Sequence, residues 1–249
     1  WKLDPAGVAA PVCITNGEGR KNKVIIRFQR LDADEERSLS DGQTILLTLF
    51  NEKDKKAGVQ LHKMGESFAI SSSRQAYPVA FSSFRKAKNA DVVSYTKETY
   101  VESPNVYVHP MNSSVRKLSN TNPQQAEYNW GTAELFKWKA YTGKEAEGII
   151  YKPEDFDPKK KYPMIVYFYE RSSQGLYGYV PPAPTPSRLN ISFFVSRGYV
   201  VFVPDIWYKK GYPGQGAYDY ILSGTRAVVK QGYVDSTKLG LQGQSWGGY

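Results

Sequence analysis

Short apolar segments alternate with turns over the first half of the chain. Five stretches combine β-branched or aromatic residues with polar ones: VIIRFQRL, TILLTLFN, GVQLHKM, YPVAFSSF and DVVSYTKE. Segments of this kind, bounded by Gly, Asn, Asp and Ser, are typical of strands separated by turns. The pattern therefore predicts a β-rich region over residues 1–125.

One strand–turn–strand pattern occurs twice in this region. WKLDPAGVAAPVCITNG at its start and VYVHPMNSSVRKLSNTN near its end share a strand-like beginning, a proline-containing turn and a polar ending. A unit that returns after about two blade lengths, at ~40–50 residues a blade, favours a β-propeller. Residues 1–125 would then form a partial propeller, consisting of the last two to three blades of the complete ring. A β-sandwich, which also has short strands and regular turns, is the alternative.

The pattern changes after residue 125. AELFKWKAYTGKEAEGIIYKP indicates a hairpin that turns at Thr142-Gly143, and MIVYFY, YVVFVPD and LGLQG indicate further strands. Between these strands we expect one helix over residues 187–197, capped by Ser187, and another over residues 217–231. Apolar strands that alternate with helices indicate a parallel sheet covered on both faces. Residues 126–249 are therefore predicted to be α/β.

Composition narrows the possible functions. The net charge of +9 is spread evenly, and the longest basic run, Lys159–Lys161, is typical of a solvated turn, so we expect no nucleic-acid partner. The single cysteine, Cys13, excludes an intrachain disulfide and a cysteine-cluster metal site, and we expect neither metal nor cofactor. No apolar run approaches the ~18 residues of a membrane span. The compartment is undetermined, and an extracytoplasmic one, periplasmic or secreted, is favoured.

The segment GLQGQSWGGY carries the candidate chemistry. Ser245 lies between Gly243 and Gly247 in a G-x-S-x-G pattern, directly after a predicted strand, and Gly248 follows where a helix would begin. This is the context of a nucleophile elbow, whose tight turn exposes a serine at the carboxyl edge of a sheet. The backbone N–H of Trp246 would then point toward a developing oxyanion. A purely structural glycine turn is the alternative.

Several motifs together resemble the prolyl oligopeptidase family, particularly its dipeptidyl peptidase IV-like and bacterial acylaminoacyl- or prolyl-peptidase branches. They are EGIIYKP, KYPMIVYFY and GQSWGGY, behind a β-repeat region. The resemblance implies a β-propeller portion followed by the N-terminal part of an α/β-hydrolase domain, ending at the elbow. It also implies that Tyr169, at the end of MIVYFY, offers its hydroxyl as a second oxyanion donor. From the residues alone, Tyr169 and Tyr167 could equally be an aromatic pair in the packing of the sheet.

Two segments depart from the family pattern. A Gly-Pro-rich turn often follows the tyrosine in the family, whereas this chain has Glu170-Arg171-Ser172-Ser173. The common D-x-R-G appears as PDIWYKKG, which keeps Asp205 without the arginine. Glu170 and Arg171 could contact the substrate, or they could form a surface ion pair.

The acid–base partners of Ser245 are not evident. In α/β-hydrolases the chain order is Ser, then Asp or Glu, then His. The two histidines, His62 and His109, both precede Ser245, so neither is a credible general base. We therefore expect an incomplete chain whose triad Asp and His lie beyond Tyr249, and which is nearly inactive alone.

The predicted function is that of a serine-type peptidase, which hydrolyses short peptides through an acyl-enzyme, after proline or as a dipeptidyl- or oligopeptidase. An esterase of the α/β-hydrolase type is one alternative, and a non-catalytic propeller that binds a partner is another. The expected partner is a peptide substrate, and a homodimer is possible.

Overall fold

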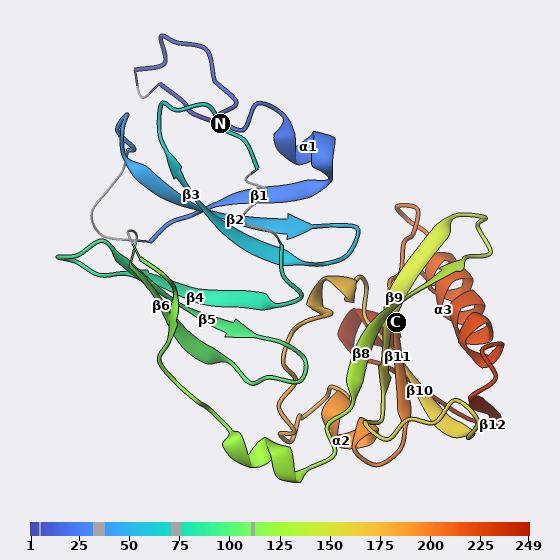
Figure 1. Ribbon diagram of the computed structural model, residues 1–249. Helices are drawn as coiled ribbons and strands as arrows, with labels where there is room; N and C mark the ends of the chain where they lie inside the picture. Colours follow the sequence, from blue (N-terminus) through green and yellow to red (C-terminus); the bar gives the residue numbers. More distant parts are fainter. Residues whose placement is uncertain (5, 32–37, 71–75, 111–112) are drawn as a thin grey trace. The chain divides into compact units, whose positions relative to one another are not determined.

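The computed structural model describes residues 1–4, 6–31, 38–70, 76–110 and 113–249, and it divides into two compact units (Figure 1). Unit 1 comprises residues 1–98 and 104–120, and unit 2 comprises residues 99–103 and 121–249. The short segment 99–103 is tied to unit 2, because Trp130 Nε1 donates a hydrogen bond to the Tyr100 carbonyl at 2.7 Å. The main break at residue 120 lies close to the expected division at residue 125.

Unit 1 contains two open antiparallel sheets (Figure 1). The five apolar stretches expected to be strands are present, whereas the two strands expected in the N-terminal segment are not. The first sheet has the order β1-β2-β3, with β1 at Val24–Gln29, β2 at Thr44–Asn51 and β3 at Ala57–Lys63. The second has the order β4-β5-β6-β7, with β4 at Ala80–Lys86, β5 at Val92–Glu98, β6 at Asn105–Pro110 and β7 at Arg116–Lys117. Two open sheets are consistent with a partial propeller, and the number of blades stays a prediction.

Alternation along β2 explains how unit 1 is packed. Leu46 is buried in a cluster with Phe84, Val93, Tyr95 and Tyr107, whereas Ile45 and Leu47 are buried on the other side with Met64 and Phe68. Successive strand residues point to opposite faces, so β2 is apolar on both sides. The strand therefore contributes to two clusters of the same unit.

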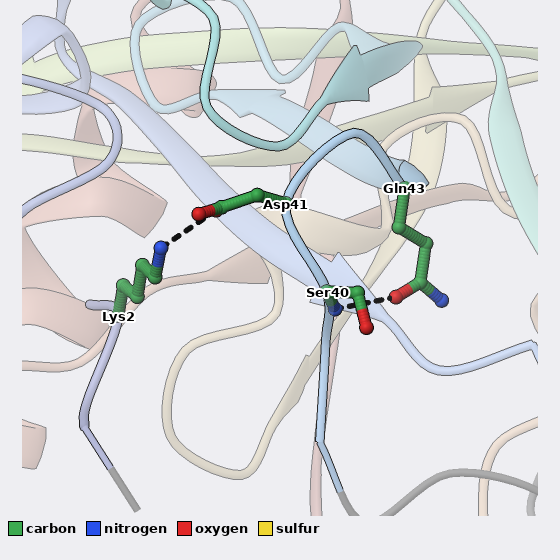
Figure 2. Close-up of polar contacts among 4 residues, drawn as sticks. All are labelled: Lys2, Ser40, Asp41 and Gln43. Atoms are coloured by element: carbon green, nitrogen blue, oxygen red, sulfur yellow. Dashed lines mark hydrogen bonds and ion pairs between the residues drawn. The ribbon is translucent and has the colours of Figure 1, made fainter.

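The N-terminal segment of unit 1 is held mainly by turns. The first copy of the repeated pattern forms a single antiparallel bridge between Lys2 and Val12, and its Pro5 lies outside the described residues. Figure 2 shows the contact with the loop before β2: Lys2 Nζ lies 2.6 Å from Asp41 Oδ1, and Ser40 N–H donates to Gln43 Oε1 at 3.0 Å. The ion pair is exposed and contributes about 1 kcal/mol or less. A one-turn helix, α1 (Glu18–Asn22), follows this segment and was not predicted.

Unit 2 is built on a five-stranded sheet of order β12-β10-β11-β9-β8. The hairpin turning at Thr142-Gly143 is present as β8 (Thr132–Lys139) and β9 (Glu145–Lys152). The remaining strands are β10 (Tyr162–Phe168), β11 (Val200–Pro204) and β12 (Val234–Gly243). Since β10 runs parallel to both β11 and β12, the carboxyl ends of these strands meet at one edge of the sheet.

Helices cover both faces of this sheet, as predicted. The helix α3 (Pro213–Val229) packs on one face, where Phe202 of β11 is buried with Tyr220 and Val228 (Figure 1). The shorter α2 (Ile191–Val195) packs on the other, where Val201 and Val203 are buried with Ile191 and Val195. Alternate residues of β11 thus face opposite helices, which explains why the whole strand is apolar.

The start of α2 differs from the expected one. Asn190, rather than Ser187, is the N-cap, because Asn190 Oδ1 accepts a hydrogen bond from Phe193 N–H at 2.8 Å. The Asn190 amide nitrogen also donates to the carbonyls of Pro181 (3.0 Å) and Ala183 (2.5 Å). These bonds fix the preceding loop, so the helix begins at residue 191. Its expected stop is present, since Gly198 has a φ of +82°.

Candidate active site

The candidate site lies at the carboxyl edge of the sheet in unit 2. Three parallel strands end there: β12 leads to Ser245, β10 leads to Tyr169 and β11 leads to Asp205. Phe168 pairs with Gly243 at the ends of β10 and β12, so Tyr169 and the G-x-S-x-G turn leave the sheet side by side. In chain order, β10 is the third strand of this sheet and β12 the fifth. The loop after the third strand is where α/β-hydrolases place an oxyanion donor.

The backbone of Ser245 has a left-handed conformation, with a φ of +54°. The side chain is exposed, and the residue opens a one-turn helix, η3 (Ser245–Gly248), closed by a 2.9 Å hydrogen bond from Gly247 N–H to the Gln244 carbonyl. A positive φ is uncommon outside glycine, and such strain costs on the order of 1–3 kcal/mol. A strained, exposed serine between a strand and a helix is the geometry of a nucleophile elbow.

At two of the three glycines around Ser245, the surrounding backbone leaves no room for a side chain. A Cβ on Gly243 would lie 1.8 Å from the Gly247 carbonyl oxygen, and a Cβ on Gly247 would lie 2.3 Å from the Phe168 carbonyl oxygen. Neither distance is compatible with a side chain. Around Gly248, in contrast, the nearest atom would be 3.9 Å away. The G-x-S-x-G spacing therefore reflects close backbone packing of the turn against the end of β10.

Trp246 follows Ser245 in the first turn of η3, where backbone N–H groups have no partner within the helix. Its ring is 39% exposed and contacts two others, Tyr208 at 6.2 Å and Tyr249 at 5.4 Å between ring centroids. These contacts fix the orientation of the residue beside the candidate nucleophile. An N–H at such a helix start can bind a developing negative charge.

Tyr169 lies immediately after β10, and its side chain is 45% exposed. Tyr167, two residues earlier, packs instead against the apolar cluster on the α2 face. The two tyrosines therefore have different surroundings, and Tyr169 leaves the sheet at the edge where Ser245 lies. A Cβ on Gly247 would lie 3.2 Å from Tyr169 Cα, which shows how closely the two loops approach.

Glu170 and Arg171 have separate partners, and no ion pair joins them in the described part of the chain. Glu170 Oε1 accepts a hydrogen bond from Tyr208 Oη at 2.5 Å, and this bond raises the pKa of the Tyr208 hydroxyl. The Arg171 guanidinium lies over the Trp207 ring, 4.4 Å from its centroid. Both side chains thus connect the loop after β10 with the loop after β11.

Asp205, noted in the sequence as the retained residue of the D-x-R-G pattern but given no role there, is a structural residue of the site. Its carboxylate is 3% exposed and accepts hydrogen bonds from Ser172 N–H at 2.6 Å, Ser173 N–H at 2.8 Å and Ser173 O–H at 2.5 Å. Charge-assisted bonds of this kind hold the loop that follows Tyr169. The available signal was an acidic residue directly after the wholly apolar strand β11.

The two histidines lie in unit 1, whereas Ser245 lies in unit 2. His62 in β3 is 7% exposed, with its ring packed edge-on against Phe68, and His109 in β6 pairs with Val93. Within the described ranges no group of three or more His, Cys, Asp or Glu side chains could hold a metal ion. Over the same ranges, none of the helices has both the length and the apolar character needed to cross a membrane.

Comparison with known proteins supports the predicted resemblance. No family model matches the chain. Dipeptidyl peptidase 8 of Mus musculus is 30% identical over 128 residues, which is 47% of this chain and 14% of that protein. Dipeptidyl-peptidase 5 of Porphyromonas gingivalis is 27% identical over 178 residues, 64% of this chain and 24% of that protein. The chain thus spans less than a quarter of these curated relatives.

Solved structures show the same fold. Dipeptidyl peptidase 4 of Porphyromonas gingivalis matches 99% of this chain and 34% of its own, with a TM-score of 0.68 and 20% identity. A prolyl endopeptidase also matches 99% of this chain and 35% of its own, with a TM-score of 0.61 and 14% identity. The relatives and structural neighbours of this chain are therefore peptidases of the dipeptidyl peptidase IV and prolyl oligopeptidase family, as its motifs predicted.

Proposed function

We propose that this protein is a serine-type peptidase in which Ser245 is the nucleophile. The observation that carries the proposal is the elbow itself: an exposed serine with a φ of +54°, between two glycines that have no room for a Cβ. A structural glycine turn would not need to hold a serine in a strained backbone conformation at the edge of a parallel sheet.

The proposed reaction is acyl transfer. Ser245 Oγ attacks the peptide carbonyl carbon, the C–N bond breaks as the amine takes up a proton, and water then hydrolyses the acyl-enzyme. The Trp246 backbone N–H and the Tyr169 hydroxyl donate hydrogen bonds to the oxyanion, each worth on the order of 3 kcal/mol. The positions of η3 and of the end of β10 support these two roles.

Ser245 also needs a general base, because a serine hydroxyl is a weak nucleophile on its own. Neither histidine of this sequence lies in the unit that carries Ser245. We propose that the triad Asp and His are supplied by residues outside these 249. The isolated 249-residue chain should then hydrolyse peptides far more slowly than the full-length gene product.

The names of the relatives support a short-peptide substrate, cleaved as a dipeptide or after proline. Two open antiparallel sheets in unit 1 support its assignment to the last blades of a propeller. An esterase of the same fold remains the second candidate. Hydrolysis of prolyl peptide amides and of short acyl esters, measured on the same sample, separates the two activities.

The test is active-site labelling of the full-length gene product with a fluorophosphonate, followed by mass spectrometry. We expect one adduct on Ser245, and Ser245→Ala should lose both the adduct and peptide hydrolysis, by at least about 10⁴-fold. Ser83→Ala is the matched control, because Ser83 also has a positive φ (+56°) but lies in the irregular strand β4 of unit 1. Normal turnover by Ser245→Ala would refute the proposal.

The role of Tyr169 requires a separate variant. Tyr169→Phe removes only the hydroxyl, so kcat should fall about 10²-fold or more while KM changes little. Tyr167→Phe is the control, since Tyr167 packs in the core cluster beside α2. If the two variants have equal kcat values, Tyr169 is not an oxyanion donor.

A further inference from the structure

Arg171 is an exposed cation held in place at the edge of the candidate site. Its guanidinium lies 4.4 Å from the centroid of the Trp207 ring, and the ring itself is 51% exposed. Such a stack fixes the plane of the guanidinium and leaves the N–H groups on its rim available to a planar anion. The neighbouring Ser172 N–H is bonded to buried Asp205, so the backbone beside Arg171 is fixed as well.

The acidic groups nearest to Arg171 along the two loops are already engaged. The Glu170 carboxylate accepts the Tyr208 hydroxyl, and the oxygens of Asp205 accept bonds from Ser172 and Ser173. In the described part of the chain, no carboxylate lies within 4.0 Å of the Arg171 guanidinium nitrogens. Charge at this position is therefore not neutralised by a direct partner.

Two further cations follow Trp207 and Tyr208 in the loop after β11. Lys209 and Lys210 are both exposed, and Lys209 Nζ lies 5.5 Å from the centroid of the Tyr212 ring. Neither lysine forms an ion pair with a described carboxylate. Arg171, Lys209 and Lys210 form what we call the basic edge, and its potential favours an anionic ligand.

The sheet order gives the spacing between the start of the Ser245 turn and the start of the loop that carries Trp207, on which Arg171 stacks. Ser245 follows β12, Trp207 follows β11, and β10 lies between the two strands. Neighbouring strands are about 4.8 Å apart, so the two loops leave the sheet about 10 Å from each other. An extended peptide covers that distance with about three residues, at roughly 3.3 Å each.

We propose that the basic edge binds a carboxylate of the peptide substrate, two or three residues from the scissile bond, with Arg171 as the main ligand. The inference rests on the proposed function, because it takes Ser245 as the nucleophile. The substrate class is thus an acidic short peptide, with an Asp or Glu side chain or a free terminal carboxylate at that distance. Arg171 donates paired N–H groups to the carboxylate, and the lysines add attraction.

The test measures how peptides protect Ser245 from a fluorophosphonate in the full-length gene product. The tetrapeptide amides Ala-Pro-Ala-Asp and Asp-Ala-Ala-Pro are compared with the same peptides in which Asn replaces Asp. We expect one Asp peptide to half-protect at a concentration about five- to tenfold lower than its Asn counterpart, as for a partly exposed charge pair. Whichever peptide shows the preference also reports on which side of the scissile bond the basic edge lies.

Variants of Arg171 test whether this residue causes the preference for the Asp peptide over the Asn peptide. Arg171→Met should bring the Asp and Asn peptides to equal protection, and Arg171→Lys should keep part of the preference. Arg197→Met is the matched control, because Arg197 is likewise exposed and stacked on an aromatic ring, 3.7 Å from the Phe193 centroid. It precedes β11 and so lies toward the opposite edge of the sheet.

The outcomes separate this inference from the proposed function. If wild-type Ser245 is not labelled, the proposed function fails and this inference fails with it. If labelling is normal but the Asp and Asn peptides protect equally, or no peptide protects, only the basic edge is refuted. A preference that persists unchanged in Arg171→Met also overturns the assignment.

Discussion

At the scale of single residues, the turn at Ser245 combines a strained residue with two glycines that make the strain possible. The left-handed φ of Ser245 needs support from its surroundings, because an isolated turn would relax. Here the support is backbone packing: the Gly247 carbonyl lies against Gly243, and Gly247 lies against the end of β10. The geometry of the candidate nucleophile is thus determined by neighbours that lack a side chain.

Gly247→Ala tests this directly. A Cβ 2.3 Å from the Phe168 carbonyl oxygen must displace the turn, so we expect a loss of about 3 kcal/mol in unfolding free energy and slower labelling of Ser245. Thermal denaturation and the labelling rate are the two measurements. Gly248→Ala is the control, because a Cβ there would be 3.9 Å from the nearest atom. Equal behaviour of the two variants would show that close packing does not hold the turn.

A second residue-scale feature is the buried hydroxyl of Tyr100. Its side chain is 3% exposed, and the hydroxyl makes no hydrogen bond with acceptable geometry within the described residues. The nearby Ser192 hydroxyl donates its proton to the Val180 carbonyl. Burial accordingly raises the pKa of Tyr100 to about 12, because the ionised form cannot be solvated there.

This burial predicts alkaline destabilisation of unit 2. Above pH 10 the unfolded chain releases the Tyr100 proton while the folded unit keeps it, so Tyr100 alone lowers the unfolding free energy by about 1.4 kcal/mol per pH unit up to pH ~12. Because burial also raises the pKa values of Tyr151 and Tyr233 in the same unit, Tyr100→Phe should remove only the contribution of Tyr100, and it should leave stability at pH 7 nearly unchanged. Denaturant titrations at pH 7, 10 and 11 measure both. Tyr128→Phe, at a 66% exposed position, should leave the decline intact.

At the scale of elements, α3 shows packing overriding helix propensity. Gly224 lies in the buried face of this helix, where a Cβ would be 2.9 Å from ring carbons of both Phe202 and Trp138. Trp138 Nε1 also donates a 3.0 Å hydrogen bond to Ser223 Oγ. The absent side chain lets α3 approach the sheet closely enough for these contacts to form.

Gly224→Ala should therefore destabilise the protein even though alanine is the better helix former. Propensity would contribute about 1 kcal/mol in favour of alanine, but overpacking against two aromatic rings costs about 1–3 kcal/mol. Gly214 lies in the first turn of α3, and a Cβ there would have no atom within 4 Å. Gly214→Ala therefore gains the helix propensity of alanine without the cost of overpacking. Melting temperatures should move in opposite directions for the two variants. A rise in both would mean that the rings rearrange at little cost.

Hydrophobic periodicity predicted the elements well because it records which face each strand or helix buries. It gave most strands of both units and the 142–143 hairpin, whereas the serine turn was predicted from the G-x-S-x-G motif that follows a strand. Periodicity did not give the start of α2, because that start depends on the hydrogen bonds of the Asn190 amide. The amide donates to the carbonyls of Pro181 and Ala183 and accepts from Phe193 N–H. Periodicity also did not give the role of Asp205, because that role depends on a loop more than 30 residues earlier in the chain.

At the scale of the whole molecule, β12 is an edge strand in the described part of unit 2. Leu241 on this strand is 68% exposed and Leu239 is 42% exposed, and the two lie on the same face. An exposed apolar edge is a template for pairing with another chain. We expect the 249-residue chain to self-associate as its concentration rises.

Leu241→Lys should weaken that association, because a charge on the edge opposes both pairing and apolar contact. Sedimentation velocity at a series of concentrations measures the effect. Val101→Lys is the control, since Val101 is 54% exposed in unit 2 but lies outside the strands of its sheet. Equal association of wild type and Leu241→Lys would exclude β12 as the contact.

The bonds of Asn190 have a consequence for how the protein should be produced. Asn190-Ile191-Ser192 is an acceptor sequence for N-linked glycosylation, yet the asparagine amide is bonded on both its nitrogen and its oxygen, and Ser192 is 2% exposed. A sugar attached to that nitrogen before folding would occupy the space of the loop over residues 181–183 and replace one of the N–H groups that donate to the Pro181 and Ala183 carbonyls. A host without N-glycosylation is therefore the suitable one, and a secreting eukaryotic host should be given Asn190→Asp, which keeps the capping oxygen and removes the acceptor.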